Sequence, residues 1–407
     1  MFSTYEQQQN VAWGNRVAGW RGVLVLVVLT VLTASSAQAG DVERKQAKRI
    51  HDRLTGVPPT PTVLTAMETM ITSGDAVGAA LLAIDPNQNP RAFNFYNTTL
   101  KNFATPWTNE AQSIFDPLND YSATVIGMIR DDVPFNTLLS ADMIYVADST
   151  IPGVAAYSPA NNTSYQNLED LSVDLSDPTM LIQKVQSTES GIPAAGVAGV
   201  ITTRAAAEAF FVDGTNRAMF RFTMLNHLCN DMDQLKDTTR PTDRIRQDVS
   251  RSPGGDSRIF MNACVGCHSG MDPMTQAFAY HDYDATTGRM VYTPGQVRPK
   301  YLINADNFEY GYVTPDDHWD NYWRSGPNAA LGWGAGTGSG NGAASLGLEI
   351  GNSTAFASCQ VKKAYRTVCL NEPDQAQMVA LRDVLTNQTN YNMKQVFAEA
   401  AVQCMGN

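Results

Sequence analysis

One motif near the middle of the chain constrains this sequence more than any other feature, and it reads Cys264-Val265-Gly266-Cys267-His268. Two thiols separated by two residues can each bond to one vinyl group of a porphyrin, and the adjacent imidazole can then bind its iron. The motif therefore predicts one covalently attached haem c. Cys264 and Cys267 would attach it, and His268 would be the proximal ligand of the iron. One such motif in 407 residues leaves most of the chain as scaffold around the cofactor.

The same five residues could instead belong to a zinc site or hold purely structural cysteines. A zinc ion would require further ligands in a comparable cluster. The other cysteines are isolated from one another in the sequence: Cys229, Cys359, Cys369 and Cys404. Haem is the favoured interpretation.

The N-terminal 39 residues have the pattern of a secretory signal peptide. Arg16 and Arg21 precede an apolar run over 23–32, and a small-x-small cleavage site follows at 37–39. The run is shorter than the roughly 20 residues of a membrane span, although an uncleaved signal anchor is the alternative. The pattern predicts a signal peptide over residues 1–39 and a periplasmic or secreted mature protein. No lipid anchor is expected, because no cysteine lies near the cleavage site.

The charge balance of the predicted mature chain is acidic. Removal of Glu6, Arg16 and Arg21 from the 29 basic and 40 acidic residues leaves 27 and 39, a formal charge of −12. This balance argues against nucleic acid as a partner. It is compatible with a redox partner protein that has a basic surface, and it is also ordinary for a secreted protein.

Four cysteines remain outside the motif, and in an oxidising compartment they predict two disulfides. If 354–369 forms one helix, Cys359 and Cys369 lie about 15 Å apart along its axis, too far for a bond. Two further amphipathic segments follow, up to Cys404, so three antiparallel helices are expected. This arrangement favours Cys369 with Cys404, which leaves Cys229 with Cys359.

The rest of the chain indicates a mostly α fold, a helical scaffold with long ordered loops around one haem site. Apolar residues at helical spacing share one face immediately before Cys229: Phe220, Met224, Leu225 and Leu228. Residues 143–146 form one of few strand-like runs. Proline or glycine clusters at 58–61, 252–255 and 332–347 predict loops and hinges.

These boundaries divide the chain into five segments. They are a signal peptide (1–39), an N-terminal helical domain (40–150), a helical linker region (151–252), a haem c-binding segment (253–350) and a C-terminal helical hairpin or three-helix unit (351–407).

The sixth position of the iron would decide the function. A bound Met or His makes an electron-transfer site, whereas an open position can bind peroxide or oxygen. The distal candidates are Met290, His281 and Met274. Three further residues are weaker candidates. Met271, like Met274, lies so soon after His268 that a core or haem-contact role is expected for it. His227 is expected to be a satisfied buried histidine, and His318 a surface histidine.

Several separated segments resemble the large planctomycete-type family of secreted bacterial cytochrome c proteins. The segments are Arg53 to Thr60 (RLTGVPPT), Arg130 to Asp142 (which is similar to a DxPFxxLLxAD helix), Ala198 to Thr202, Asn216-Arg217, Leu228-Cys229, Cys264 to His268, Asp272-Pro273 with Phe278, Asp284 to Arg289, and Phe356 to Cys359. The resemblance covers roughly residues 45 to 405. It implies a secreted haem c module inside an α-rich scaffold.

Two departures from the family pattern stand close to the motif. Met274-Thr275 replaces a common Leu-Gly pair, and Tyr280-His281 replaces an acidic residue. The family mostly lacks assigned activities, so the resemblance supports the cofactor and says little about a reaction.

Three functions are compatible with these patterns. The first is a secreted mono-haem cytochrome that transfers single electrons in the periplasm or at the cell surface. The second is a haem enzyme of the peroxidase or oxygenase type with an open distal site, although familiar dihaem enzymes would need a second motif. The third is a partner-docking protein with a structural or sensory haem.

Overall fold

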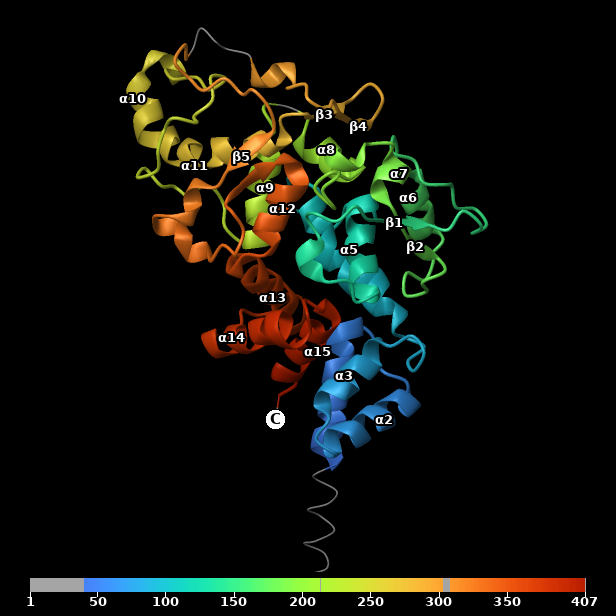
Figure 1. Ribbon diagram of the computed structural model, residues 1–407. Helices are drawn as coiled ribbons and strands as arrows, with labels where there is room; N and C mark the ends of the chain where they lie inside the picture. Colours follow the sequence, from blue (N-terminus) through green and yellow to red (C-terminus); the bar gives the residue numbers. More distant parts are fainter. Residues whose placement is uncertain (1–39, 213, 303–307, 407) are drawn as a thin grey trace, which may run out of the picture.

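The computed structural model describes residues 40–212, 214–302 and 308–406, and over them the chain is mostly α, as predicted (Figure 1). A first helical stretch covers residues 40–55. The helices that follow are α2 (Pro61–Thr72), α3 (Ala76–Ile84), α4 (Lys101–Ala104), α5 (Asp120–Arg130), α6 (Thr163–Asp170), α7 (Gln186–Ser190), α8 (Arg204–Phe210), α9 (Arg217–Leu228), α10 (Ser257–Ile259), α11 (Val265–Thr275), α12 (Gly342–Gly351), α13 (Thr354–Cys369), α14 (Gln375–Asp383) and α15 (Met393–Gln403).

The strands of the described residues form three short antiparallel pairs. They are β1 (Ile144–Ala147) with β2 (Leu181–Lys184), β3 (His281–Asp284) with β4 (Arg289–Tyr292), and β5 (His318–Asp320) with β6 (Ser339–Asn341). The strand-like run at 143–146 is confirmed, shifted by one residue, as β1. Each pair lies among helices and loops, so the strands do not build a central sheet (Figure 1).

One hydrophobic core joins the predicted segments of the mature chain. It extends in sequence from Ala47 to Ala401 and takes residues from all four of those segments. The N-terminal helix α3 lies beside the C-terminal helix α15, and α2 packs against α3 (Figure 1). A small separate core lies close to the motif and consists of Ile245, Val249, Phe260 and Val265.

Local capping explains why the C-terminal helices form where the sequence predicts them. The Ser353 hydroxyl accepts a hydrogen bond from the Phe356 amide at the start of α13, and Leu370 ends that helix in a left-handed conformation. Asp374 and Gln377 form a capping box at the start of α14. The predicted helix over 354–369 is confirmed.

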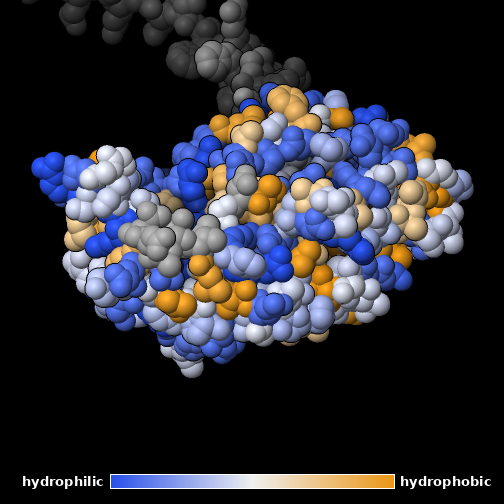
Figure 2. All heavy atoms as spheres, turned by 90° about the horizontal axis from the view of Figure 1, so that it is seen from above, coloured by the Kyte–Doolittle hydropathy of each residue, from blue (hydrophilic) through white to orange (hydrophobic). Residues whose placement is uncertain are grey.

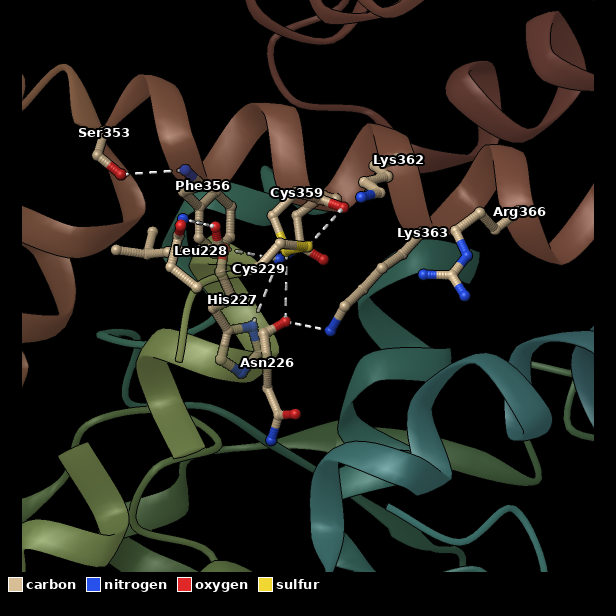
Figure 3. Close-up of a disulfide and its surroundings, with 12 residues drawn as sticks. Asn226, His227, Leu228, Cys229, Ser353, Phe356, Cys359, Lys362, Lys363 and Arg366 are labelled. Carbon is tan, nitrogen blue, oxygen red and sulfur yellow. Dashed lines mark hydrogen bonds between the residues drawn. A yellow bond between two sulfur atoms is a disulfide. The ribbon is translucent and has the colours of Figure 1, made fainter. Parts of the chain in front are cut away.

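Both predicted disulfides are present. Cys229 is bonded to Cys359 with a Cα–Cα distance of 5.3 Å, and Cys369 to Cys404 with 5.8 Å. The first ties the end of α9 to α13, and the buried residues Asn226, His227 and Phe356 lie near it (Figure 3). The second ties the end of α13 to the end of α15, as antiparallel packing of the three helices requires.

Two expectations for local structure are wrong. The glycine-rich segment 332–347 is not a loop throughout, because α12 begins at Gly342. Its glycines allow close packing: a Cβ on Gly347 would lie 1.8 Å from the Leu139 carbonyl oxygen. The segment 131–142, which resembles a family helix, has only a 3-10 turn at Phe135–Thr137, where Pro134 removes a backbone donor.

Two sequence predictions concern the membrane. The predicted signal peptide over 1–39 lies outside the described residues. Among the residues that are described, no helix is long and apolar enough to cross a bilayer.

Candidate cofactor site

The motif lies where a π-helical turn, Phe260–Cys264, runs into α11. Cys264, Cys267 and His268 follow at helical spacings of three and four residues, so they share one side of this segment. All three side chains are half-buried, between core and solvent. The segment therefore presents two thiols and one imidazole together at an accessible surface.

The two thiols of the motif are unpaired, whereas the other four cysteines are in disulfides. The Cys267 sulfur lies 3.5 Å from the Met232 carbonyl oxygen. Burial raises the pKa of the Cys267 thiol, and the nearby Lys236 ammonium only partly opposes this effect. Cys267 thus lacks the lowered pKa that a thiol-exchange nucleophile requires.

The imidazole of His268 has a defined partner. Its Nδ1 lies 3.0 and 3.1 Å from the two carboxylate oxygens of Asp272, one helical turn later. An ionised carboxylate only accepts hydrogen bonds, so Nδ1 carries the proton and donates it. In the neutral ring this leaves the lone pair of Nε2 available for a metal.

Asp272 is fully buried and is held by basic groups. The Arg217 guanidinium donates to it from Nε at 2.8 Å, and the Arg246 backbone N–H donates at 3.1 Å. Burial alone would raise the pKa of this carboxyl, but Arg217, His268 and Arg246 hold its pKa well below the usual range. Asp272 is therefore ionised at neutral pH.

A second buried carboxylate completes this group. Asp248 accepts from Arg217 at 2.9 Å and from the Arg246 side chain at 3.4 Å. We call Arg217, Arg246, Asp248 and Asp272 the buried charge cluster. It contains two positive and two negative groups, which offsets the cost of burying each of them.

Close backbone packing holds α11 in place. A Cβ on Gly270 would lie 1.9 Å from the Trp323 indole nitrogen, so only glycine fits there without a shift. Gly266 faces the chain over 236–238, where its carbonyl accepts the Asp237 N–H at 2.9 Å. Helix α11 is thus packed on the side that its glycines occupy.

Aromatic and apolar groups flank the motif. The Phe260 ring lies 5.7 Å from the His268 ring, and the Arg251 guanidinium lies over both Phe260 and Phe308, at 4.3 and 4.6 Å. Ile259 and Met261, just before the motif, are 46% and 51% exposed. On the molecular face shown in Figure 2, apolar residues form several small groups among hydrophilic ones.

The donor set fits a haem c group. Cys264 and Cys267 are free for two thioether bonds, Nε2 of His268 is free for iron, and half-exposed apolar side chains lie beside them. Over the residues described, no group of three or more His, Cys, Asp or Glu side chains could hold a metal ion.

The distal candidates all lie in the buried interior. Met274 and Met290 belong to the main core, at 0% and 9% exposure. Met274 is on the same helix as His268, six residues on and about 120° around its axis. The His281 ring packs at 4.9 Å from Tyr292, and its Nε2 lies 2.8 Å from the Gly196 carbonyl oxygen. The distal ligand stays a prediction.

Two other histidines take the roles expected for them. His227 is buried, with Nε2 at 2.7 Å from the Tyr121 hydroxyl, and it lies beside the Cys229–Cys359 disulfide (Figure 3). His318 lies on the surface in β5, and its Nε2 is 3.6 Å from an oxygen of Asp320. Neither lies in the candidate site.

Asp272 is the site residue whose role the sequence patterns leave unassigned. Its spacing of four from His268 would have indicated a contact if 265–275 had been expected to be helical. Arg217, Arg246 and Asp248 come from distant segments, and no sequence signal joins them to the motif.

Comparison of the chain with protein-family models, with curated proteins and with solved structures finds no match. The resemblance to the planctomycete-type cytochrome c family therefore stays a prediction, and the chemistry of the site rests on its own residues.

Proposed function

We propose that this protein is a secreted mono-haem c-type cytochrome that transfers single electrons in the periplasm or at the cell surface. One observation carries the proposal. Two unpaired thiols and an imidazole with a free Nε2 share one side of a helix, in a chain whose other four cysteines form disulfides.

Each residue of the site has a role in this proposal. Cys264 and Cys267 would hold the porphyrin, and His268 would bind its iron through Nε2. Asp272 fixes the tautomer and the orientation of the ring. When bound, the haem supplies one-electron chemistry between ferric and ferrous iron.

The proposed location and partner rest on separate observations. The two disulfides support an oxidising compartment, which agrees with a signal peptide over residues 1–39. The acidic net charge supports a redox partner protein with a basic surface.

A haem enzyme of the peroxidase or oxygenase type is the second candidate. Two observations favour it. The three distal candidates are buried in the interior whereas the Cys and His side chains of the motif are half-exposed, which would leave the sixth position of the iron open. The proximal histidine also contacts a carboxylate. A carboxylate partner increases the basicity of the imidazole, which favours the higher oxidation states of iron. A docking protein with a structural or sensory haem is the third candidate.

The experiment is a visible spectrum of the oxidised and reduced protein after expression with a haem c maturation system. The variants are Met274→Leu, His281→Gln and Met290→Leu, and Met128→Leu, buried in α5, is the matched control. We expect a low-spin haem whose spectrum changes in one variant and not in the control. A high-spin spectrum that shifts with cyanide would contradict electron transfer and support the enzyme.

A further inference from the structure

We propose that Asp272 is a positioning residue that lowers the reduction potential of the haem through its hydrogen bond with His268. This inference rests on the proposed haem site and adds a property of it. Both carboxylate oxygens of Asp272 lie within 3.0 and 3.1 Å of Nδ1 of His268.

The environment of Asp272 makes this hydrogen bond strong. The carboxylate is 0% exposed, so water does not compete for it. Arg217 and the backbone of Arg246 fix it from the other side. Hydrogen bonds to a charged acceptor are about twice as strong as those between neutral groups.

The expected effect on the iron follows from charge. A carboxylate that accepts the Nδ1 proton gives the imidazole more negative character, so Nε2 donates more electron density. This stabilises ferric iron over ferrous iron and lowers the potential. Hydrogen bonding of the axial ligand is one of the ways by which a protein sets haem potentials.

The buried charge cluster contains a matched control for this effect. Asp248 is also buried and also pairs with Arg217, but its hydrogen bonds go to Arg217 and Arg246 and not to His268. Asp248→Asn removes one negative charge from the same cluster, as Asp272→Asn does. Only Asp272→Asn replaces the carboxylate that contacts the imidazole.

The experiment measures the reduction potential of the purified haem protein and of both variants by spectroelectrochemical titration. We expect Asp272→Asn to raise the equilibrium constant for reduction at least about tenfold, or about 59 mV for one electron. We expect Asp248→Asn to raise it less than about threefold. Equal shifts in the two variants would overturn the inference, because a general charge effect would then account for both.

A second measurement covers the case in which Asp272→Asn does not fold. In the reduced wild-type protein, proton NMR should show a His268 Nδ1 proton that exchanges slowly with water, because its acceptor is buried. A proton that exchanges as fast as that of an exposed imidazole would overturn the inference. If the wild-type protein binds no haem at all, the proposed function fails and this inference falls with it, which distinguishes the two failures.

Discussion

The C-terminal helices and α11, the helix that contains most of the motif, differ in how their cysteines are bonded and in how well their residues suit a helix. Helices α13 and α14 have side-chain caps and contain no Gly or Pro, and both cysteines of α13 are in disulfides. Helix α11 follows a π-helical turn, contains Pro273, and leaves its cysteine unpaired. The scaffold helices thus have sequences that suit a helix, whereas the proposed site lies on a helix that contains Gly and Pro.

The largest expected effect is the loss of stability when disulfide cysteines are removed, compared with removal of the two cysteines of the motif. Loss of the Cys229–Cys359 bond, which closes a separation of 130 residues, should lower the free energy of unfolding by about 5 kcal/mol. Loss of the Cys369–Cys404 bond, with a separation of 35, should cost about 4 kcal/mol. Urea denaturation of Cys229→Ala/Cys359→Ala and Cys369→Ala/Cys404→Ala checks both values.

The matched control is Cys264→Ala/Cys267→Ala in the protein without haem. Because these thiols close no loop, we expect a change of less than about 1 kcal/mol. A loss as large as that of the disulfide variants would contradict the distinction between scaffold and attachment cysteines.

The next effect is the pH dependence of stability that His281, shortly after α11, should produce. Burial lowers the pKa of His281 to about 4, although its hydrogen bond with Gly196 partly opposes this shift. An unfolded histidine titrates near 6.5, so the unfolded chain binds more protons between pH 6.5 and 4. His281 should therefore contribute a fall in stability of about 3 kcal/mol as the pH falls through this range.

His281→Gln isolates this contribution. Glutamine keeps a donor for the Gly196 carbonyl but does not titrate. The variant should lose less stability between pH 6.5 and 4 than the wild type, by about 3 kcal/mol. Parallel pH profiles of the two proteins would show that His281 does not carry the effect.

The smallest effect tests the packing of α11. Gly270→Ala places a methyl group 1.9 Å from the Trp323 indole nitrogen and should cost about 2 kcal/mol of stability. Gly266→Ala meets its nearest atom, on Thr238, at 3.3 Å, and alanine favours a helix, so we expect a change within about 1 kcal/mol. Thermal unfolding of both variants measures the difference. Equal losses would show that α11 is not held by close contact at Gly270.

Sequence patterns predicted the scaffold well and the site only in part. Periodic apolar residues and spacing predicted the helix over 354–369 and the pairing of Cys369 with Cys404. The motif predicted Cys264, Cys267 and His268 as the residues of the site. Gly266, Gly270 and Pro273 disfavour a helix locally, so α11 depends on tertiary contacts that no local pattern contains.

The same reason applies to the partner of His268. Without a helix over 265–275, the spacing of four to Asp272 indicates nothing. Arg217 reaches Asp272, and Asp248 reaches Arg217, only because the fold brings distant segments together. Likewise, α12 starts inside a glycine-rich segment, and the close contact of its Gly347 with the Leu139 backbone is a tertiary contact that no local pattern contains.

Mass spectrometry of the protein expressed with a haem c maturation system tests directly whether the motif attaches haem. We expect one haem per chain, retained after denaturation, on the peptide that contains Cys264 and Cys267. Cys264→Ala/Cys267→Ala should carry none. A wild-type chain without covalent haem, or a haem attached elsewhere, would show that the motif is not a haem c site.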